Sequence, residues 1–204
     1  MGYYPIVMDL TDRNCLIVGG GEVALRKAES LTEAGANVTV IALEIDSRLE
    51  ALASVRIEKR AWRPGDAAGY TLVFAATDDR AVNQSVSDEA KASGIPVNVV
   101  DDPELCSFIV PSCVKRGDLM IAVSTSGRSP SLSKKIRREL ELKYGPEYAD
   151  FVALLGELRD VVKREHASST EREAAFERII HCEALDLLRA GRREQAREKA
   201  LECI

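Results

Sequence analysis

The sequence predicts an α/β fold, in which an open parallel sheet with helices on both faces is followed by a β-hairpin and a helical region. Two observations support this prediction. Short apolar strands alternate with helical patterns over the first hundred or so residues, which is the order that builds a parallel sheet. From Pro130 onward the chain is helical and highly charged, with breaks at Gly145-Pro146, at 168–170 and at Gly191.

The first unit of this pattern is a strand, a glycine turn and a helix. Residues 15–18 form a wholly apolar strand that runs into Gly19-Gly20-Gly21, and a helical pattern follows until the segment 34–36. A β-branched strand at 37–42 completes a strand–helix–strand unit, as a parallel crossover requires. Further strands are expected at 55–59, 72–76 and 97–100, with a helix over 81–93.

The pattern changes after Pro103. Two strand-like runs, at 108–114 and 119–124, are joined by the residues Lys-Arg-Gly-Asp, which suit a hairpin connection. The helical residues that follow are expected to form a small bundle. We therefore expect boundaries after residue 112 and after residue 145.

Composition narrows the class of protein and its partners. The 204 residues are 46% hydrophobic, which is too apolar for a disordered chain, and the net charge of −5 argues against nucleic-acid binding. The segment Met1 to Asp12 lacks a basic leader, and no apolar run reaches the roughly eighteen residues of a membrane span. These features predict a cytoplasmic protein with no membrane partner.

The glycine turn fits the dinucleotide-binding pattern G-x-G-x-x-A, because it follows a buried strand and opens a helix that carries Ala24. Gly19 permits the tight turn, and Gly21 lets the backbone approach a pyrophosphate that faces the helix N-terminus. The sequence therefore predicts a Rossmann-type domain that binds a nicotinamide dinucleotide. Its first expected contacts are Gly19, Gly21, Glu22 and Val23.

Further cofactor contacts are expected where later strands end. Glu44 lies about twenty residues past the glycines, where a carboxylate binds the adenosine ribose hydroxyls, so Glu44 favours NAD over NADP. Leu43, which precedes it, is also an expected cofactor contact. The alternative is that Glu44 is a solvated loop acid. Ala76 and Thr77 end another strand at the carboxyl edge of the sheet, where ligands bind in such folds.

Several motifs in register resemble one family. The segments CLIVGGGEVALRKA, FAATDD, VNQSVSD, NVVDDP, SFIVPS and VSTSGRSP are similar to the precorrin-2 dehydrogenase module of siroheme synthases, including its stand-alone form. The resemblance implies that the protein oxidises precorrin-2 to sirohydrochlorin in siroheme biosynthesis, with NAD as hydride acceptor. It also implies a homodimer that holds the tetrapyrrole between its two domains. Some members also insert ferrous iron as a ferrochelatase, and the sequence does not decide whether this chain does.

The resemblance also indicates which residues act on the substrate. Loss of a hydride and a proton needs an ionisable base, and Asp101 matches the aspartate of the family's NVVD motif. The segment Ser124–Pro130 joins a strand to a helix and presents hydroxyls, amides and a guanidinium to an anion. Helix capping is the alternative for both regions. The residues expected to bind substrate carboxylates are Ser124, Thr125, Ser126 and Arg128.

We therefore expect the chain to have three functional parts. They are an NAD-binding domain over residues 1–112, a dimerisation and substrate-binding region over 113–145, and a helical C-terminal domain over 146–204. Neither the two histidines nor the five cysteines show metal-ligand spacing, so no bound metal is expected. The competing function is a non-catalytic NAD-sensing regulatory domain. It would need neither Asp101 nor the segment Ser124–Pro130.

Overall fold

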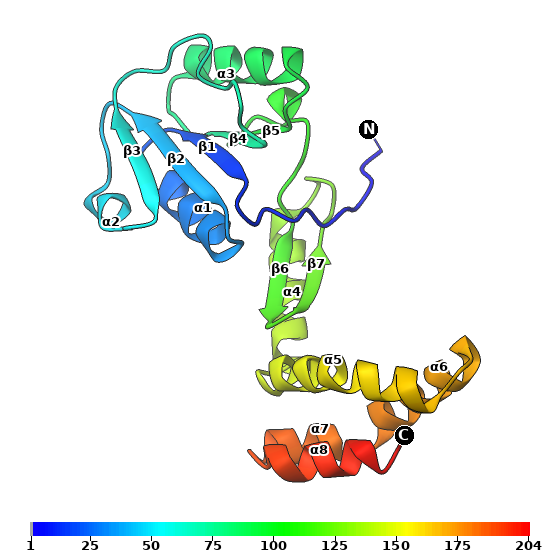
Figure 1. Cartoon of the computed structure of the whole chain (residues 1–204). Coiled ribbons are helices and arrows are strands. Elements are labelled where there is room, and N and C mark those ends of the chain that lie inside the picture. The colour runs from blue at the N-terminus through cyan, green and yellow to red at the C-terminus, as the bar shows by residue number, and fades with distance from the viewer. Residues whose placement is uncertain (1) are drawn as a thin grey trace. The chain divides into compact units, whose positions relative to one another are not determined.

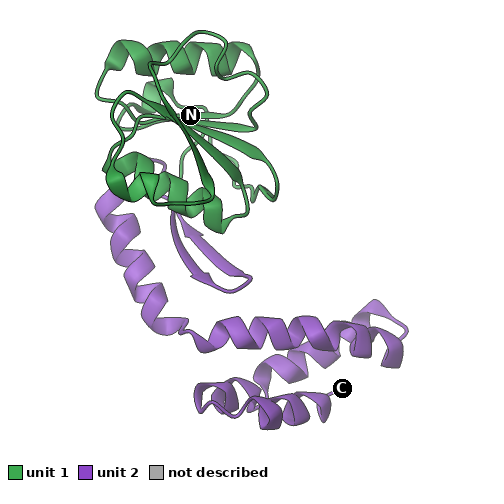
Figure 2. Cartoon of the chain, turned by 60° about the vertical axis from the view of Figure 1, so that its left-hand side comes forward, with its two compact units in different colours: residues 1–110 green, residues 111–204 purple. Residues whose placement is uncertain are grey.

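The structure is a computed structural model that describes residues 2–204. Met1, the first residue of the predicted NAD-binding domain, lies outside the described residues. The chain divides into two compact units (Figure 1 and Figure 2). Unit 1 ends at Val110 and unit 2 extends from Pro111 to Ile204. The predicted α/β fold class, with a hairpin and a helical region after the sheet, is confirmed. The division into three functional parts stays a prediction.

Unit 1 is built on a parallel sheet of five strands in the order β3-β2-β1-β4-β5. The chain steps outward from β1 to β3 and then crosses back to β4. The carboxyl ends of β1 and β4 therefore flank the point where the strand order reverses, which is where ligands bind in open parallel sheets. The strands are β1 (Asn14–Val18), β2 (Asn37–Ala42), β3 (Val55–Lys59), β4 (Leu72–Ala75) and β5 (Val97–Val99).

Helices cover both faces of this sheet. Because successive strand side chains point to opposite faces, Cys15 and Ile17 of β1 share one core with α1 (Glu22–Glu33). Leu16 and Val18 share the other core with α3 (Arg80–Ala92). Burial of the Cys15 thiol raises its pKa to about 11, so this cysteine serves as an apolar core residue. Two short elements, α2 (Ser47–Glu50) and the 3-10 helix η1 (Pro103–Leu105), complete the unit.

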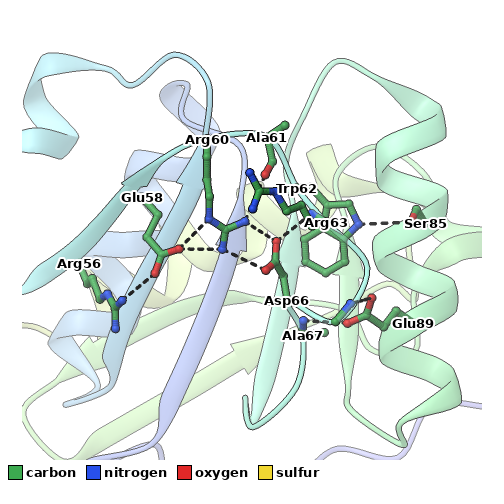
Figure 3. Close-up of polar contacts among 11 residues, drawn as sticks. Arg56, Glu58, Arg60, Ala61, Trp62, Arg63, Asp66, Ala67, Ser85 and Glu89 are labelled. Carbon is green, nitrogen blue, oxygen red and sulfur yellow. Dashed lines mark hydrogen bonds and ion pairs between the residues drawn. The ribbon is translucent and has the colours of Figure 1, made fainter.

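The connection from β3 to β4 contains no helix, and we call its residues 60–71 the strap. Arg60 binds Glu58 at 2.7 Å and Asp66 at 2.6 Å, which ties the strap to the end of β3 (Figure 3). Glu89 of α3 accepts hydrogen bonds from the backbone amides of Gly65 and Ala67, both at 2.8 Å. Polar contacts thus hold the strap between the sheet edge and α3.

Unit 2 begins with the antiparallel hairpin of β6 (Ser112–Arg116) and β7 (Leu119–Val123). The strand predicted at 108–114 was placed too early. The side-chain amide of Asn98 donates to the carbonyl of Phe108 at 3.0 Å, and the Phe108 ring packs edge-on against Phe74 at 5.5 Å between centroids. Residues 108–110 therefore pack in unit 1, and the hairpin starts only after Pro111.

The rest of unit 2 is helical, as predicted. Helix α4 packs against the hairpin, where Arg116 donates to the carbonyls of Tyr144 at 2.9 Å and of Glu141 at 3.3 Å. The later helices share a core of their own, in which Leu158 and Ile179 are fully buried. No helix within residues 2–204 is long and apolar enough to cross a membrane. The helices are α4 (Pro130–Lys143), α5 (Glu147–Glu165), α6 (Ser169–His181), α7 (Ala184–Arg189) and α8 (Arg193–Leu201).

Candidate nucleotide-binding site

The glycine turn after β1 is packed tightly between two neighbouring strand ends. Gly19 has a φ of +123°, and a Cβ atom built there would lie 2.2 Å from the carbonyl oxygen of Ala76. A Cβ atom on Gly20 would lie 2.1 Å from the carbonyl oxygen of Glu44. Both glycines are therefore required because backbone from the ends of β2 and β4 occupies the space of a side chain.

Gly21 stands in the same turn but faces open space. No atom lies within 4 Å of a Cβ built there, and Gly21 is the N-cap of α1 without a side-chain cap. The amides of the first turn of α1 thus have no side-chain cap from Gly21, and they carry the positive end of the helix dipole. Ala24 is fully buried one turn further on, which lets α1 approach β1 closely. This geometry fits the pyrophosphate of a dinucleotide.

A cavity of about 360 Å³ opens beside this turn at the carboxyl edge of the sheet. Val23 of α1 lines it, together with Ala76 and Thr77 after β4 and with Val100 and Asp101 after β5. The structure therefore brings together four of the residues that the sequence analysis assigned to the site. It places them at the switch point of the sheet, although their roles remain predictions.

Asn83 holds the loop after β4 in place and was missed by the sequence analysis. Its side chain is buried, with 7% exposure, and its Nδ2 donates to the carbonyl of Thr77 at 2.8 Å. The hydroxyl of Thr77 lies 2.8 Å from Asn83 Oδ1, to which it donates. A polar residue on the apolar face of a predicted helix, in line with Val86 and Ala90, is the signal that could have identified it.

Asp101 lines the cavity in a strained conformation. Its φ of +58° lies in the left-handed region, which is uncommon for a residue other than glycine. Such strain persists where surrounding structure imposes it, and it is frequent at functional sites. The neighbouring Asp102 pairs with Arg80 at 3.3 Å, whereas Asp101 has no ion-pair partner among the described residues. The carboxylate of Asp101 is therefore available to a ligand.

The end of β2 lies against the other side of the glycine turn. Leu43 and Glu44 follow β2 and are exposed, and neither lines the cavity. Glu22, the first residue of α1, pairs with Arg48 of α2. Arg48 also binds Asp46 at 2.6 Å, and the hydrogen bond from this guanidinium lowers the pKa of the Asp46 carboxyl. Sequence analysis missed this arrangement.

The predicted substrate loop, Ser124–Pro130, belongs to unit 2 and is held together by its own hydroxyls. Thr125 Oγ1 accepts a hydrogen bond from the Ser129 amide at 3.0 Å and lies 3.2 Å from Ser133 Oγ. The Ser124 hydroxyl accepts from the Ser126 amide at 3.0 Å. Two of the predicted substrate-binding hydroxyls therefore shape the loop, and the Arg128 side chain has no polar partner within residues 2–204.

Comparison with family profiles divides the chain into three matched segments. Residues 6–112 match a putative NAD(P)-binding family, which covers more than half of the chain. Residues 116–141 match the central region of sirohaem biosynthesis proteins, and residues 147–203 match the sirohaem synthase dimerisation region. The predicted nicotinamide-nucleotide-binding domain and the resemblance to siroheme synthases are confirmed by these matches.

Similar proteins of known name agree with the profiles. The chain is 41% identical to the siroheme synthase of Methylococcus capsulatus over 99% of its own length and 43% of that protein. It is 43% identical to the siroheme synthase of Methylobacillus flagellatus over 95% of its own length and 42% of that protein. The chain thus spans less than half the length of these relatives.

One solved structure matches nearly the whole chain. The precorrin-2 dehydrogenase SirC is 27% identical and has a TM-score of 0.76, with 98% of this chain and all of that chain covered. Within residues 2–204, no group of three or more His, Cys, Asp or Glu side chains is placed to hold a metal ion.

Proposed function

The chain belongs to the putative NAD(P)-binding family and also matches the central and dimerisation regions of sirohaem synthesis proteins, and we propose that it is an NAD-dependent precorrin-2 dehydrogenase. The single observation that carries the proposal is Asp101, a residue in a left-handed conformation in the cavity beside the glycine turn, whose carboxylate has no ion-pair partner within residues 2–204. A domain that only senses the nucleotide has no need of this group. The product would be sirohydrochlorin, an intermediate of siroheme biosynthesis.

In this proposal, different residues of unit 1 bind different parts of the cofactor. NAD supplies the hydride acceptor. The backbone of Gly19 and Gly21 and the first-turn amides of α1 hold the pyrophosphate, and Glu44 binds the adenosine ribose. Ala76 and Thr77 line the cavity and position the reacting end of the cofactor.

Asp101 is the general base of this proposal. Dehydrogenation removes a hydride and a proton from the reduced tetrapyrrole, and the Asp101 carboxylate accepts the proton. Asp102 is a poorer candidate for the base, because its carboxylate is already paired with Arg80 at 3.3 Å.

The substrate carries many carboxylates, and the loop of unit 2 offers a suitable anion site. In this proposal the hydroxyls of Ser124, Thr125 and Ser126 and the guanidinium of Arg128 bind these carboxylates. The protein would act as a homodimer, in keeping with the match of residues 147–203 to a dimerisation region.

The first test mixes the purified protein with precorrin-2 and NAD without metal and follows NADH and sirohydrochlorin together. We expect both products to form at equal rates. Asp101→Asn, which tolerates a left-handed φ, should lower turnover by roughly 10²- to 10⁴-fold while NAD still binds. Asp102→Asn, a change of the same kind in the same cavity, should retain most of the activity.

Two results would contradict the proposal. NAD binding without any turnover by the unaltered chain would favour a nucleotide-sensing domain. Unchanged turnover in Asp101→Asn would remove this residue from the mechanism.

A second experiment adds ferrous iron as a substrate after sirohydrochlorin has formed. Sirohydrochlorin that stays metal-free would exclude ferrochelatase activity.

A further inference from the structure

We propose that Glu22 and Asp46 make this site selective for NAD by engaging the guanidinium of Arg48, which would otherwise be free to bind the 2′-phosphate of NADP. This inference rests on the nucleotide site of the proposed function and is independent of the reaction performed there. It identifies three specificity residues that lie next to the glycine turn and outside the cavity.

The backbone brings the three residues to the glycine turn. The amide of Asp46 donates to the carbonyl of Gly20 at 2.8 Å, so the segment after β2 is fixed against the turn. Asp46 also caps α2, because its Oδ1 accepts a hydrogen bond from the amide of Arg48 at 2.9 Å. Glu22 extends from the first residue of α1 on the other side of the turn.

The guanidinium of Arg48 is held by both carboxylates. Its Nε donates to Asp46 Oδ1 at 3.1 Å and its Nη2 to Asp46 Oδ2 at 2.6 Å. The same Nη2 donates to Glu22. A two-point contact between a guanidinium and a carboxylate is the strongest arrangement for such a pair, and it fixes the plane of the guanidinium.

The identity of Arg48 alone would suggest the opposite specificity. In Rossmann domains a carboxylate after the second strand binds the ribose hydroxyl of NAD, and a nearby arginine accommodates the 2′-phosphate of NADP. Here both features are present, since Glu44 and Arg48 follow β2. The pairing favours NAD, because the Nε and Nη2 of this guanidinium are already bound to two carboxylates.

Charge reinforces the effect of the pairing. Two carboxylates, those of Glu22 and Asp46, contact the guanidinium of Arg48, and Glu44 precedes Asp46 by two residues in the same segment. A phosphate monoester adds a charge of about −1.5 to −2 near neutral pH. The 2′-phosphate of NADP would bind beside these two carboxylates, whereas the uncharged hydroxyl of NAD meets no such repulsion.

The test measures the affinity of the whole chain for NAD and for NADP by calorimetry, without substrate. The double variant Glu22→Gln, Asp46→Asn frees Arg48, and asparagine can still cap α2. We expect its affinity for NADP to rise about tenfold or more, with NAD affinity changed less than about threefold. Adding Arg48→Ala to the double variant should remove the gain.

A matched control keeps the pairing and removes one charge. Glu50 lies on α2 and pairs with Lys59, so Glu50→Gln lowers the negative charge of the same helix and should leave the affinity ratio unchanged. Thermal unfolding of every variant checks that the fold is kept.

The outcomes separate this inference from the proposed function. If the double variant keeps the affinity ratio of the unaltered chain, or if its gain for NADP survives the loss of Arg48, the inference is wrong and the dehydrogenase proposal stands. If the unaltered chain binds neither nucleotide, the site itself is wrong and both fall.

Discussion

Gly19 and Gly21 are two residues apart in one turn, yet they are glycines for different reasons. Gly19 is required by the fold, because backbone of β4 occupies the position of its side chain and its φ is +123°. Gly21 has a φ of −90°, which any residue adopts, and open space beside it. The fold does not require a glycine at this position, and we propose that the approach of the cofactor does.

This difference predicts opposite phenotypes for the same substitution. Gly19→Ala should destabilise unit 1 by about 3 kcal/mol, because the new methyl group meets a carbonyl 2.2 Å away in a strained backbone conformation. Gly21→Ala should change stability by no more than about 1 kcal/mol but weaken NAD binding about tenfold or more. Urea unfolding and NAD titration measure the two effects. Normal stability in Gly19→Ala, or normal NAD affinity in Gly21→Ala, would refute the assignment.

Strands and helices can be predicted from the local sequence pattern more readily than the side-chain contacts between them. The strands at 37–42 and 55–59 and the helix beginning at Pro130 have the predicted bounds. The strap was not predicted, because its residues lack periodicity and its structure comes from Arg60, Asp66 and Glu89. Arg60 and Asp66 pair within the strap, and Arg60 and Glu89 link it to β3 and α3.

The Arg60–Asp66 pair makes the stability of the strap depend on pH. The side-chain hydrogen bond from Arg60 lowers the pKa of Asp66 in the folded protein. A lowered folded pKa stabilises the fold above the unfolded pKa of about 3.9, and this contribution is lost as pH falls below it. Asp66→Asn should therefore be less stable than the unaltered chain at pH 7, with a difference that narrows below about pH 4.

Urea unfolding at several pH values provides this measurement. Asp88→Asn is a suitable control, because Asp88 is an exposed residue of α3 whose side chain accepts a hydrogen bond from Gln84 at 2.8 Å and has no ion-pair partner among residues 2–204. A stability difference for Asp66→Asn that stayed constant down to pH 3 would show that the ion pair is not its cause.

The whole molecule consists of two units with separate hydrophobic cores. The cores of unit 1 lie on the two faces of the parallel sheet, and that of unit 2 lies among α5 to α8. Each unit contains its own predicted site residues, with the nucleotide site in unit 1 and the Ser124–Pro130 loop in unit 2. Core substitutions are therefore expected to act within one unit.

Leu158→Ala tests this independence. Leu158 is 1% exposed in the core of unit 2, and its truncation should destabilise that unit by about 2–5 kcal/mol. Because NAD binds in unit 1, its affinity should stay within about twofold. Hydrogen exchange resolved along the chain reports the two units separately. Faster exchange in β1 and β4 as well as in α5 would mean that the units unfold together.

The sequence by itself determined most elements of the fold, the glycine turn and the family, although it placed the first strand of the hairpin too early. These depend on local pattern: apolar runs form strands, glycines permit the turn, and motifs in register identify relatives. The motif also identified Asp101 as a candidate base, but only the structure revealed its left-handed φ and its place in the cavity.

Only the tertiary structure decided which side chains meet. Asn83 binds the loop after β4, the Glu22–Arg48–Asp46 cluster joins the starts of α1 and α2, and Glu89 reaches the strap from α3. Such contacts join residues that the crossover connections bring together, and a linear pattern does not encode their distances. For the same reason, Arg48 read from the sequence alone would suggest NADP binding. The proposed preference for NAD rests on its contacts with Glu22 and Asp46, which only the structure shows.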